Sequence, residues 1–257
     1  MLLAELVGGS VEDARVRAAE TPLESVIAAC ENAPAPRDAL TALAPAAGVK
    51  IIAEVKRASP SRGRLADIPD PAALASAYEE GGASAISVLT EQRRFLGSLD
   101  DLRAVRAQVG IPVLRKDFIA DPYQVYEARA AGADIVLLIV AALDQRTLVS
   151  LHELASSLRL TALVETHSAE EISRALDAGA RLVGVNARDL DTFELDRDLF
   201  GSLADRIPAG VTRVAESAVL SPDDVRHYRE AGADVVLVGE ALVTGDPTAR
   251  LAEFLAA

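Results

Sequence analysis

The chain has 257 residues, half of them hydrophobic, which is enough for one domain with a large core. Its 39 Asp and Glu outnumber its 26 Lys and Arg, and the net charge of −13 repels phosphodiester backbones and anionic lipids, so we expect neither nucleic acid nor a membrane as a partner. The lone Cys30 excludes an intrachain disulfide, no signal-peptide pattern is present, and the apolar run 135–143 is too short to cross a bilayer, so we expect a cytoplasmic location.

The first 48 residues lie outside the repeating pattern that begins at residue 49. Their hydrophobic spacing predicts helices near residues 11–19 and 22–32, a link with Pro34 and Pro36, and a short helix before Pro45. We expect a helical extension that either plugs the bottom of the fold or forms a lid over its functional end.

From residue 49 onward, a Gly-Ala pair recurs roughly every 50 residues. Each pair follows a helical pattern and precedes an apolar run, so the Gly is expected to end a helix and the run to form a strand buried on both faces. The pairs are Gly82-Ala83, Gly132-Ala133, Gly179-Ala180 and Gly232-Ala233. Strands are predicted at 49–56, 85–90, 113–118, 134–140, 160–166, 182–188, 212–217 and 235–239, and helices at 71–81, 122–131, 144–158, 168–178, 221–231 and 247–256.

Strand and helix alternate throughout this region, which favours a parallel sheet. Eight units with a fourfold repeat favour a closed (β/α)₈ barrel, the TIM-barrel fold, over an open doubly wound sheet. We therefore predict a single domain over residues 1–257, with an N-terminal helical extension at 1–48 and the barrel at 49–257.

Charged and amide side chains stand at the carboxyl ends of five predicted strands, where a strand buried on both faces has no structural need for a charge. Glu54 and Lys56 are two residues apart and therefore project from the same face of the first strand. Carboxyl ends form the active-site face of such a barrel, and neighbouring charges of both signs tune one another for acid and base chemistry. We predict a proton-transfer site rather than an ion-pair network that only fills the barrel mouth. Its other members are Lys116, Glu165, Asn186, Arg188 and Glu216.

Other chemistries have less support in the sequence. The three His residues lie in separate units without a partner at metal-ligand spacing, and nucleotide-binding glycine motifs are absent, so we predict no metal and no cofactor. A Schiff base on Lys56 or Lys116 stays open. The loops after the seventh and eighth strands, at Ser217-Ala218 and Gly239-Glu240, are candidates for holding a phosphate, although an ordinary turn explains Gly239 equally well.

Longer motifs resemble the indole-3-glycerol-phosphate synthase family. The segment IIAEVKRASPSRG at 51–63 is similar to the family signature, and the resemblance continues across the whole barrel in the family's order and spacing. The further segments are FLGSLDDL at 95–102, PVLRKDFI at 112–119, DPYQVYEARAAGAD at 121–134, LVETH at 163–167, VNARDL at 185–190, AESAV at 215–219 and VGEAL at 238–242.

This resemblance implies a carbon-carbon lyase that converts 1-(2-carboxyphenylamino)-1-deoxyribulose 5-phosphate into indole-3-glycerol phosphate, with loss of carbon dioxide and water. By matching position, Lys116 is the general acid that protonates the substrate ketone, and Glu165 takes the proton lost in the dehydration. Lys56 resembles a lysine that contacts the substrate anions and assists loss of the hydroxyl, and its division of the acid role with Lys116 stays open. Glu54 and Glu216 resemble carboxylates that orient these lysines and bind substrate hydroxyls.

The resemblance also implies where a phosphorylated small-molecule substrate binds. Asn186 and Arg188 match positions near its anthranilate end, and Phe95 and Phe118 match apolar residues against its aromatic ring. The phosphate is expected at Ser59, Ser217, Ala218, Gly239 and Glu240. We expect a monomer or a weak homodimer.

Four departures from the family pattern each affect a specific expectation. Ala218 replaces a Gly, which costs steric strain if the backbone there has a positive φ. Ala39 replaces a Phe, so we expect a lid that closes less tightly. Leu96 replaces a small or polar residue. Glu240 replaces a Ser, and its carboxylate is unfavourable beside a phosphate unless it turns away.

Three alternative functions follow from the same residues. A phosphoribosylanthranilate isomerase shares the barrel but relies on an early barrel Cys, and no Cys follows Cys30. A Schiff-base aldolase would leave an adduct on Lys56 or Lys116 that borohydride traps. A catalytically weak or silent barrel that only binds a phosphorylated ligand is suggested by Ala39 and Ala218.

Overall fold

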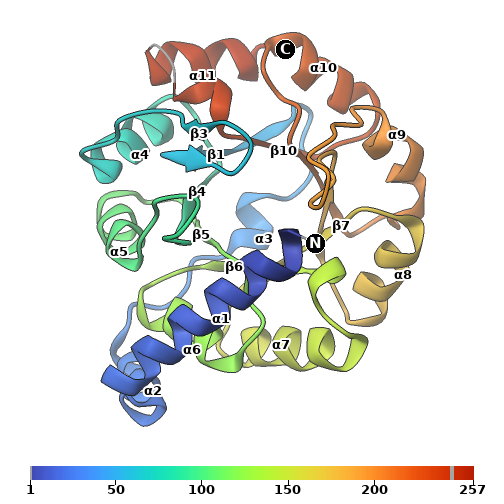
Figure 1. Ribbon diagram of the computed structural model, residues 1–257. Helices are drawn as coiled ribbons and strands as arrows, with labels where there is room; N and C mark the ends of the chain where they lie inside the picture. Colours follow the sequence, from blue (N-terminus) through green and yellow to red (C-terminus); the bar gives the residue numbers. More distant parts are fainter. Residues whose placement is uncertain (1, 244–245) are drawn as a thin grey trace.

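Residues 2–243 and 246–257, which the computed structural model describes, contain eight parallel strands closed into a barrel (Figure 1). The barrel order is β1, β4, β5, β6, β7, β8, β9, β10 and back to β1, so every neighbouring pair is parallel. The predicted (β/α)₈ barrel is confirmed. The strands are β1 Lys50–Val55, β4 Ala85–Leu89, β5 Val113–Lys116, β6 Ile135–Ile139, β7 Thr161–Thr166, β8 Leu182–Asn186, β9 Thr212–Glu216 and β10 Val235–Val238.

A ring of helices surrounds the barrel (Figure 1). The repeated glycines follow these helices with φ between 89° and 100°, as expected for the left-handed residue that ends a helix. Helices α5 and α9 occupy the two units for which the sequence pattern named none. The ring comprises α4 Pro71–Glu80, α5 Leu99–Gln108, α6 Pro122–Ala130, α7 Gln145–Ser157, α8 Ala169–Asp177, α9 Leu199–Leu203, α10 Pro222–Glu230 and α11 Pro247–Leu255.

Shorter elements lie in the loops between strands and helices. A two-residue hairpin, β2 Ala58–Ser59 and β3 Gly63–Arg64, follows β1 and was not expected. Single 3₁₀ turns, η1 Val140–Ala142 and η3 Glu240–Leu242, follow β6 and β10, and η2 Ala204–Arg206 follows α9.

The alternation of side chains along each strand divides the core in two. One set of strand side chains packs against the surrounding helices, and the other forms the barrel interior with Ile52, Leu114, Leu163 and Val214. Since side chains two residues apart share a face of a strand, the residue two positions after each of these also points inward. The next inward positions are Glu54, Lys116, Glu165 and Glu216, at the carboxyl ends of β1, β5, β7 and β9.

The N-terminal extension covers both ends of the barrel. Helix α1, Leu2–Glu20, crosses in front of the barrel in Figure 1 and packs Leu6 into the inner cluster. It begins at Leu2 rather than near residue 11, and its first turns contact parts of the chain that are distant in sequence. Among these contacts is an ion pair between Glu5 and Arg94 at 2.7 Å.

The opposite end is closed by the residues that follow α2, Leu23–Asn32. The backbone N–H of Arg37 donates to the Asp134 carboxylate just before β6, at 2.7 Å. The short helix α3, Ala39–Ala42, then packs the fully buried Ala39 into the inner cluster. Ala39 therefore belongs to a plug at the end of the barrel where the strands begin, and the expectation that it loosens a lid over the other end is wrong.

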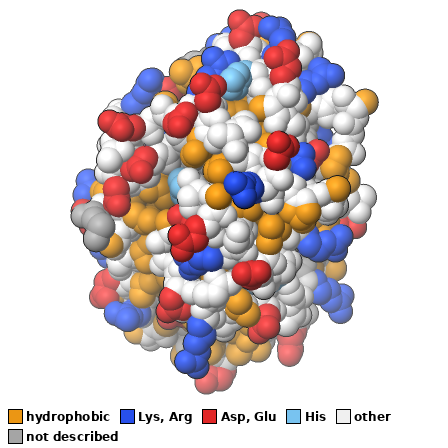
Figure 2. All heavy atoms as spheres, turned by 90° about the vertical axis from the view of Figure 1, so that its right-hand side faces the viewer, with side chains coloured by type: hydrophobic (Ala, Val, Ile, Leu, Met, Phe, Trp, Pro, Cys, Tyr) orange, Lys and Arg blue, Asp and Glu red, His pale blue; other side chains and the backbone are white. Residues whose placement is uncertain are grey.

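The side of the molecule that carries α8 and α9 shows acidic and basic side chains together, with apolar side chains between them (Figure 2). Within the described residues, no helix is both long and apolar enough to cross a membrane.

Candidate active site

Two adjoining cavities open at the carboxyl ends of the barrel strands, and they share Glu54, Lys56, Arg188, Ser217 and Glu240. Every site residue expected from the sequence lines at least one of them. The first cavity adds Ser59, Phe95, Lys116, Phe118, Glu165, Asn186 and Glu216, and the second adds Ala218 and Gly239.

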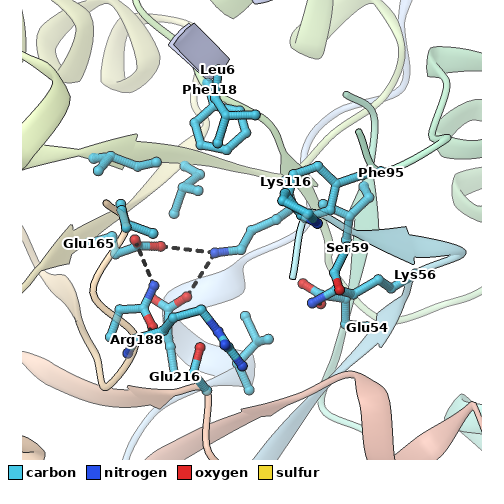
Figure 3. A pocket seen from close by; sticks show the side chains of 18 of the residues that line it. Leu6, Glu54, Lys56, Ser59, Phe95, Lys116, Phe118, Glu165, Arg188 and Glu216 are labelled. Atoms are coloured by element: carbon cyan, nitrogen blue, oxygen red, sulfur yellow. Dashed lines mark hydrogen bonds and ion pairs between the residues drawn. The ribbon is translucent and has the colours of Figure 1, made fainter. Parts of the chain in front are cut away.

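Lys116 lies at the centre of the first cavity, between two carboxylates (Figure 3). Its Nζ donates to Glu165 Oε2 and to Glu216 Oε2, each at 2.9 Å. The other oxygen of Glu165 accepts a hydrogen bond from Asn186 Nδ2 at 3.0 Å. Charge-assisted hydrogen bonds of this kind, to carboxylates that are almost fully buried, hold the ammonium group in place.

The three charges shift one another's pKa values. Burial opposes the charged form of Lys116, but the carboxylates of Glu165, Glu216 and Glu54 raise its pKa above the usual value. Burial likewise opposes ionisation of Glu165, yet Lys116, His167 and Asn186 together lower its pKa to about 2. Burial and the charge of Glu165 raise the pKa of Glu216 to about 7, against the pull of Lys116. At neutral pH the site therefore holds a protonated lysine beside an ionised carboxylate.

A second lysine lies across the cavity on the loop after β1. Lys56 Nζ is 3.3 Å from Glu54 Oε1, and Glu54 Oε2 accepts from Ser87 Oγ at 3.2 Å. The strand ends at Val55, so Lys56 faces the cavity from a loop and not from the strand itself. The strands predicted to reach Phe118, Arg188 and Ser217 also end earlier, at 116, 186 and 216.

Apolar side chains form the wall opposite the charges. The ring of Phe95 contacts the ring of Phe118 with centroids 6.1 Å apart, and Lys56 Nζ lies 5.9 Å from the Phe95 centroid. Leu6 of α1 lies close to Phe118 in Figure 3 and lines the same cavity. The sequence pattern did not identify Leu6, because only the path of the extension over the barrel brings it here.

The second cavity has an unusual backbone. Ser217 and Ala218 have φ of 68° and 53°, so Ala218 does occupy the strained region that its replacement of Gly made a concern. Glu240 forms an ion pair with Arg62 of the loop after β1, which turns its carboxylate toward that guanidinium. Arg62, which sequence reasoning missed, also donates its backbone N–H to Ser59 Oγ at 3.3 Å.

Two glycines provide room for the buried carboxylates. A Cβ at Gly239 would lie 2.6 Å from Glu54 Oε1, and one at Gly184 would overlap Glu216 Oε1. Gly239 has a φ of −119°, so close packing against Glu54 rather than a left-handed backbone explains its place. Gly184, in the middle of β8, was not identified from the sequence as part of the site.

Comparisons with known proteins identify the family to which this chain belongs. Residues 3–254 match the model of the family described as Indole-3-glycerol phosphate synthase. A protein of that name from Leifsonia xyli subsp. xyli is 69% identical over 98% of this chain and 97% of its own length. Another from Mycolicibacterium gilvum is 60% identical over 100% of this chain and 94% of its own length.

Solved structures with the same fold are more distant. A 3-hexulose-6-phosphate synthase from Salmonella typhimurium superposes with a TM-score of 0.62 at 17% identity, covering 81% of this chain and 97% of that one. A thiamine phosphate pyrophosphorylase from Pyrococcus furiosus gives 0.61 at 19% identity, covering 80% and 93%. These likenesses bear on the fold alone. The family match and the identities over nearly the whole length establish that this chain belongs to the indole-3-glycerol phosphate synthase family, a family of decarboxylating lyases, as its motifs indicated.

Proposed function

We propose that this chain closes the indole ring of 1-(2-carboxyphenylamino)-1-deoxyribulose 5-phosphate and releases carbon dioxide, water and indole-3-glycerol phosphate. The new bond joins the ring carbon that bears the carboxylate to the ketone carbon. Loss of carbon dioxide leaves its bonding electrons in the ring and restores aromaticity. The hydroxyl formed from the ketone then departs as water, and the neighbouring carbon loses a proton.

The observation that carries this proposal is the position of Lys116 between Glu165 and Glu216. An uncharged ketone is a weak acceptor for a ring carbon, so ring closure needs an acid at the ketone oxygen. Lys116 is kept protonated by its two carboxylates and is therefore available as that acid. Glu165, ionised at neutral pH, is available as the base for the proton lost in the dehydration.

Lys56 and the phosphate cavity account for the remaining charges of the substrate. Lys56, paired with Glu54, is placed to contact a substrate anion and to assist departure of the hydroxyl. Arg188 and Asn186 would bind the anthranilate carboxylate, and the rings of Phe95 and Phe118 would pack against its aromatic ring. The phosphate would take the second cavity, at Ser217, Ala218, Gly239 and Glu240, with Ser59 contributing from the adjoining first cavity.

The experiment that tests these roles compares Lys116→Ala and Glu165→Gln with the unsubstituted chain. We expect Lys116→Ala to lose ring closure while it still binds substrate, and Glu165→Gln to bind and lose turnover, in single-turnover assays that follow carbon dioxide release and indole fluorescence separately. Unimpaired turnover in either variant would contradict the assigned role.

Borohydride treatment with substrate separates this proposal from a Schiff-base mechanism. Trapping on Lys56 or Lys116 would replace acid catalysis by covalent catalysis. A cytoplasmic location and a monomeric or weakly dimeric state remain predictions.

A further inference from the structure

His167 lies directly after β7, between two carboxylates. Its Nε2 is 3.5 Å from Glu165 Oε1, and its Nδ1 is 3.3 Å from Glu171 Oε2. The backbone N–H of His167 also donates to Glu171 Oε2 at 2.7 Å. Glu171 in turn is fixed by the start of α8, where the Ser168 hydroxyl accepts from its N–H. The imidazole is thereby held in one place with one nitrogen facing the buried carboxylate.

The three side chains form a path of increasing exposure. The side chain of Glu165 is 1% exposed, that of His167 is 16% and that of Glu171 is 19%. The buried Nε2 of His167 makes no hydrogen bond within the described residues, although it faces Glu165. Its charged neighbour there is Glu165 Oε1, which lies at ion-pair distance.

Glu165 has a need that this path meets. If it accepts a proton in every turnover, it must release that proton before the next. It lines the first cavity, but its side chain is only 1% exposed. Its hydrogen-bond partners do not provide the exit. The Asn186 amide does not titrate, and Lys116 is already protonated at its own position.

We propose that His167 is a positioning and proton-exchange residue for Glu165, and this inference rests on the proposed role of Glu165 as base. The proton on Glu165 passes to Nε2, while the Nδ1 proton leaves toward Glu171 and solvent, so that one proton enters and one leaves the ring. The imidazole ends as the Nε2–H tautomer. Before the next turnover the side chain turns so that Nε2 reaches water, loses that proton there and regains one on Nδ1.

The charges around His167 favour this behaviour. Glu165 of β7, Glu171 of α8, Glu216 of β9 and Asp189 after β8 all act on it electrostatically. Burial alone would lower the pKa of His167, but the hydrogen bond to Glu171 and the charges of Glu165 and Glu216 raise it above the ordinary value. In its neutral form the ring is therefore a stronger base than Glu165, and a proton on Glu165 moves to it.

The test measures kcat and KM against pH for the full chain, His167→Ala, Glu171→Gln and the control His152→Ala. His152 lies on α7 and is absent from both site cavities. We expect His167→Ala to lower kcat at least about tenfold with little change in KM, and added imidazole to restore kcat in proportion to its concentration. We expect His152→Ala to keep the unsubstituted profile.

Glu171→Gln keeps an acceptor for the His167 N–H and removes one negative charge, so it tests the path without emptying the site. We expect the limb of the kcat profile that reports His167 to move to lower pH. An unchanged kcat in His167→Ala would overturn the inference. So would a loss of kcat that imidazole does not restore, if the pH profile of kcat in Glu171→Gln also stays where it is in the unsubstituted chain. If the unsubstituted chain itself fails to turn over the carboxyanilino sugar phosphate, the proposed function fails instead.

Discussion

Replacement of Lys116 by Ala removes the counter-ion of two carboxylates that are 1% and 2% exposed. Two buried carboxyl groups then share one space without a counter-ion. Breaking a buried ion pair in this way costs about 3 to 5 kcal/mol of stability, and loss of a general acid costs about 10² to 10⁴ in rate. We therefore expect Lys116→Ala to unfold at a clearly lower urea concentration at pH 8 and to have a kcat reduced by that range.

The stability loss should depend on pH. Without the lysine, burial and mutual repulsion raise the folded-state pKa values of Glu165 and Glu216 above those of the unfolded chain. A raised folded-state pKa stabilises the fold at low pH and loses that contribution as the pH rises through it. The deficit of the variant should therefore be largest at pH 8 and shrink toward pH 5, in urea titrations that compare both chains at each pH.

The matched control is Lys50→Ala. Lys50 lies at the other end of β1 and donates from Nζ to the Ala42 carbonyl at 2.8 Å, away from both carboxylates. It should cost about 1 kcal/mol, the net value of one hydrogen bond, and leave kcat unchanged. A Lys116→Ala chain whose stability deficit is the same at pH 5 and pH 8, or whose kcat stays within tenfold of the unsubstituted value, would refute the buried-pair reasoning.

Three further predictions concern the carboxylates around the site. A methyl group at Gly184 would overlap Glu216 Oε1, so Gly184→Ala should displace that carboxylate. We expect a loss of about 1 to 3 kcal/mol of unfolding free energy in a urea titration and at least a tenfold lower kcat. Unchanged stability and kcat would mean that the backbone of β8 shifts without cost to make room. The pKa of Glu216 is raised from 4.5 to about 7, so its proton stabilises the fold below pH 4.5 and that contribution is lost as the pH rises through 7. In Glu216→Gln, the unfolding free energy should therefore change less between pH 5 and pH 8 than in the unsubstituted chain, by about 3 kcal/mol at most. The same pH dependence in both chains would contradict the raised pKa of Glu216. Arg62→Ala removes the ion-pair partner of Glu240 in the second cavity, where we propose that the phosphate binds, and should raise the substrate KM about tenfold. Arg62→Ala combined with Glu240→Gln should recover most of that loss, and strictly additive effects would separate the pair from phosphate binding.

The sequence allowed the barrel and the gathering of its charges to be predicted because both follow from short-range rules. Strands alternate with period two, and the carboxyl ends of parallel strands meet at one rim. Glu54, Glu165 and Glu216 each stand two positions after an apolar inward residue, so their direction could be inferred before any distance was known. The backbone strain at Ala218 was anticipated only as a condition, through the resemblance to a family with Gly there.

What escaped prediction depends on contacts between distant segments. Leu6 reaches the cavity because α1 crosses the barrel, where Glu5 pairs with Arg94 of a segment distant in the chain. The Arg62–Glu240 pair joins two loops 178 residues apart in the chain. Gly184 appeared to be an ordinary strand residue until the position of Glu216 revealed the space it leaves.

The central claim is that Lys56, Lys116 and Glu165 act around one cavity to close an indole ring. The most direct measurement is turnover of 1-(2-carboxyphenylamino)-1-deoxyribulose 5-phosphate by the purified chain, followed by indole fluorescence. The chain contains no Trp, so the protein contributes no indole fluorescence of its own. We predict a rise in indole fluorescence that is proportional to enzyme concentration and matched by carbon dioxide release. A pure, folded sample that leaves this substrate unchanged would contradict the account.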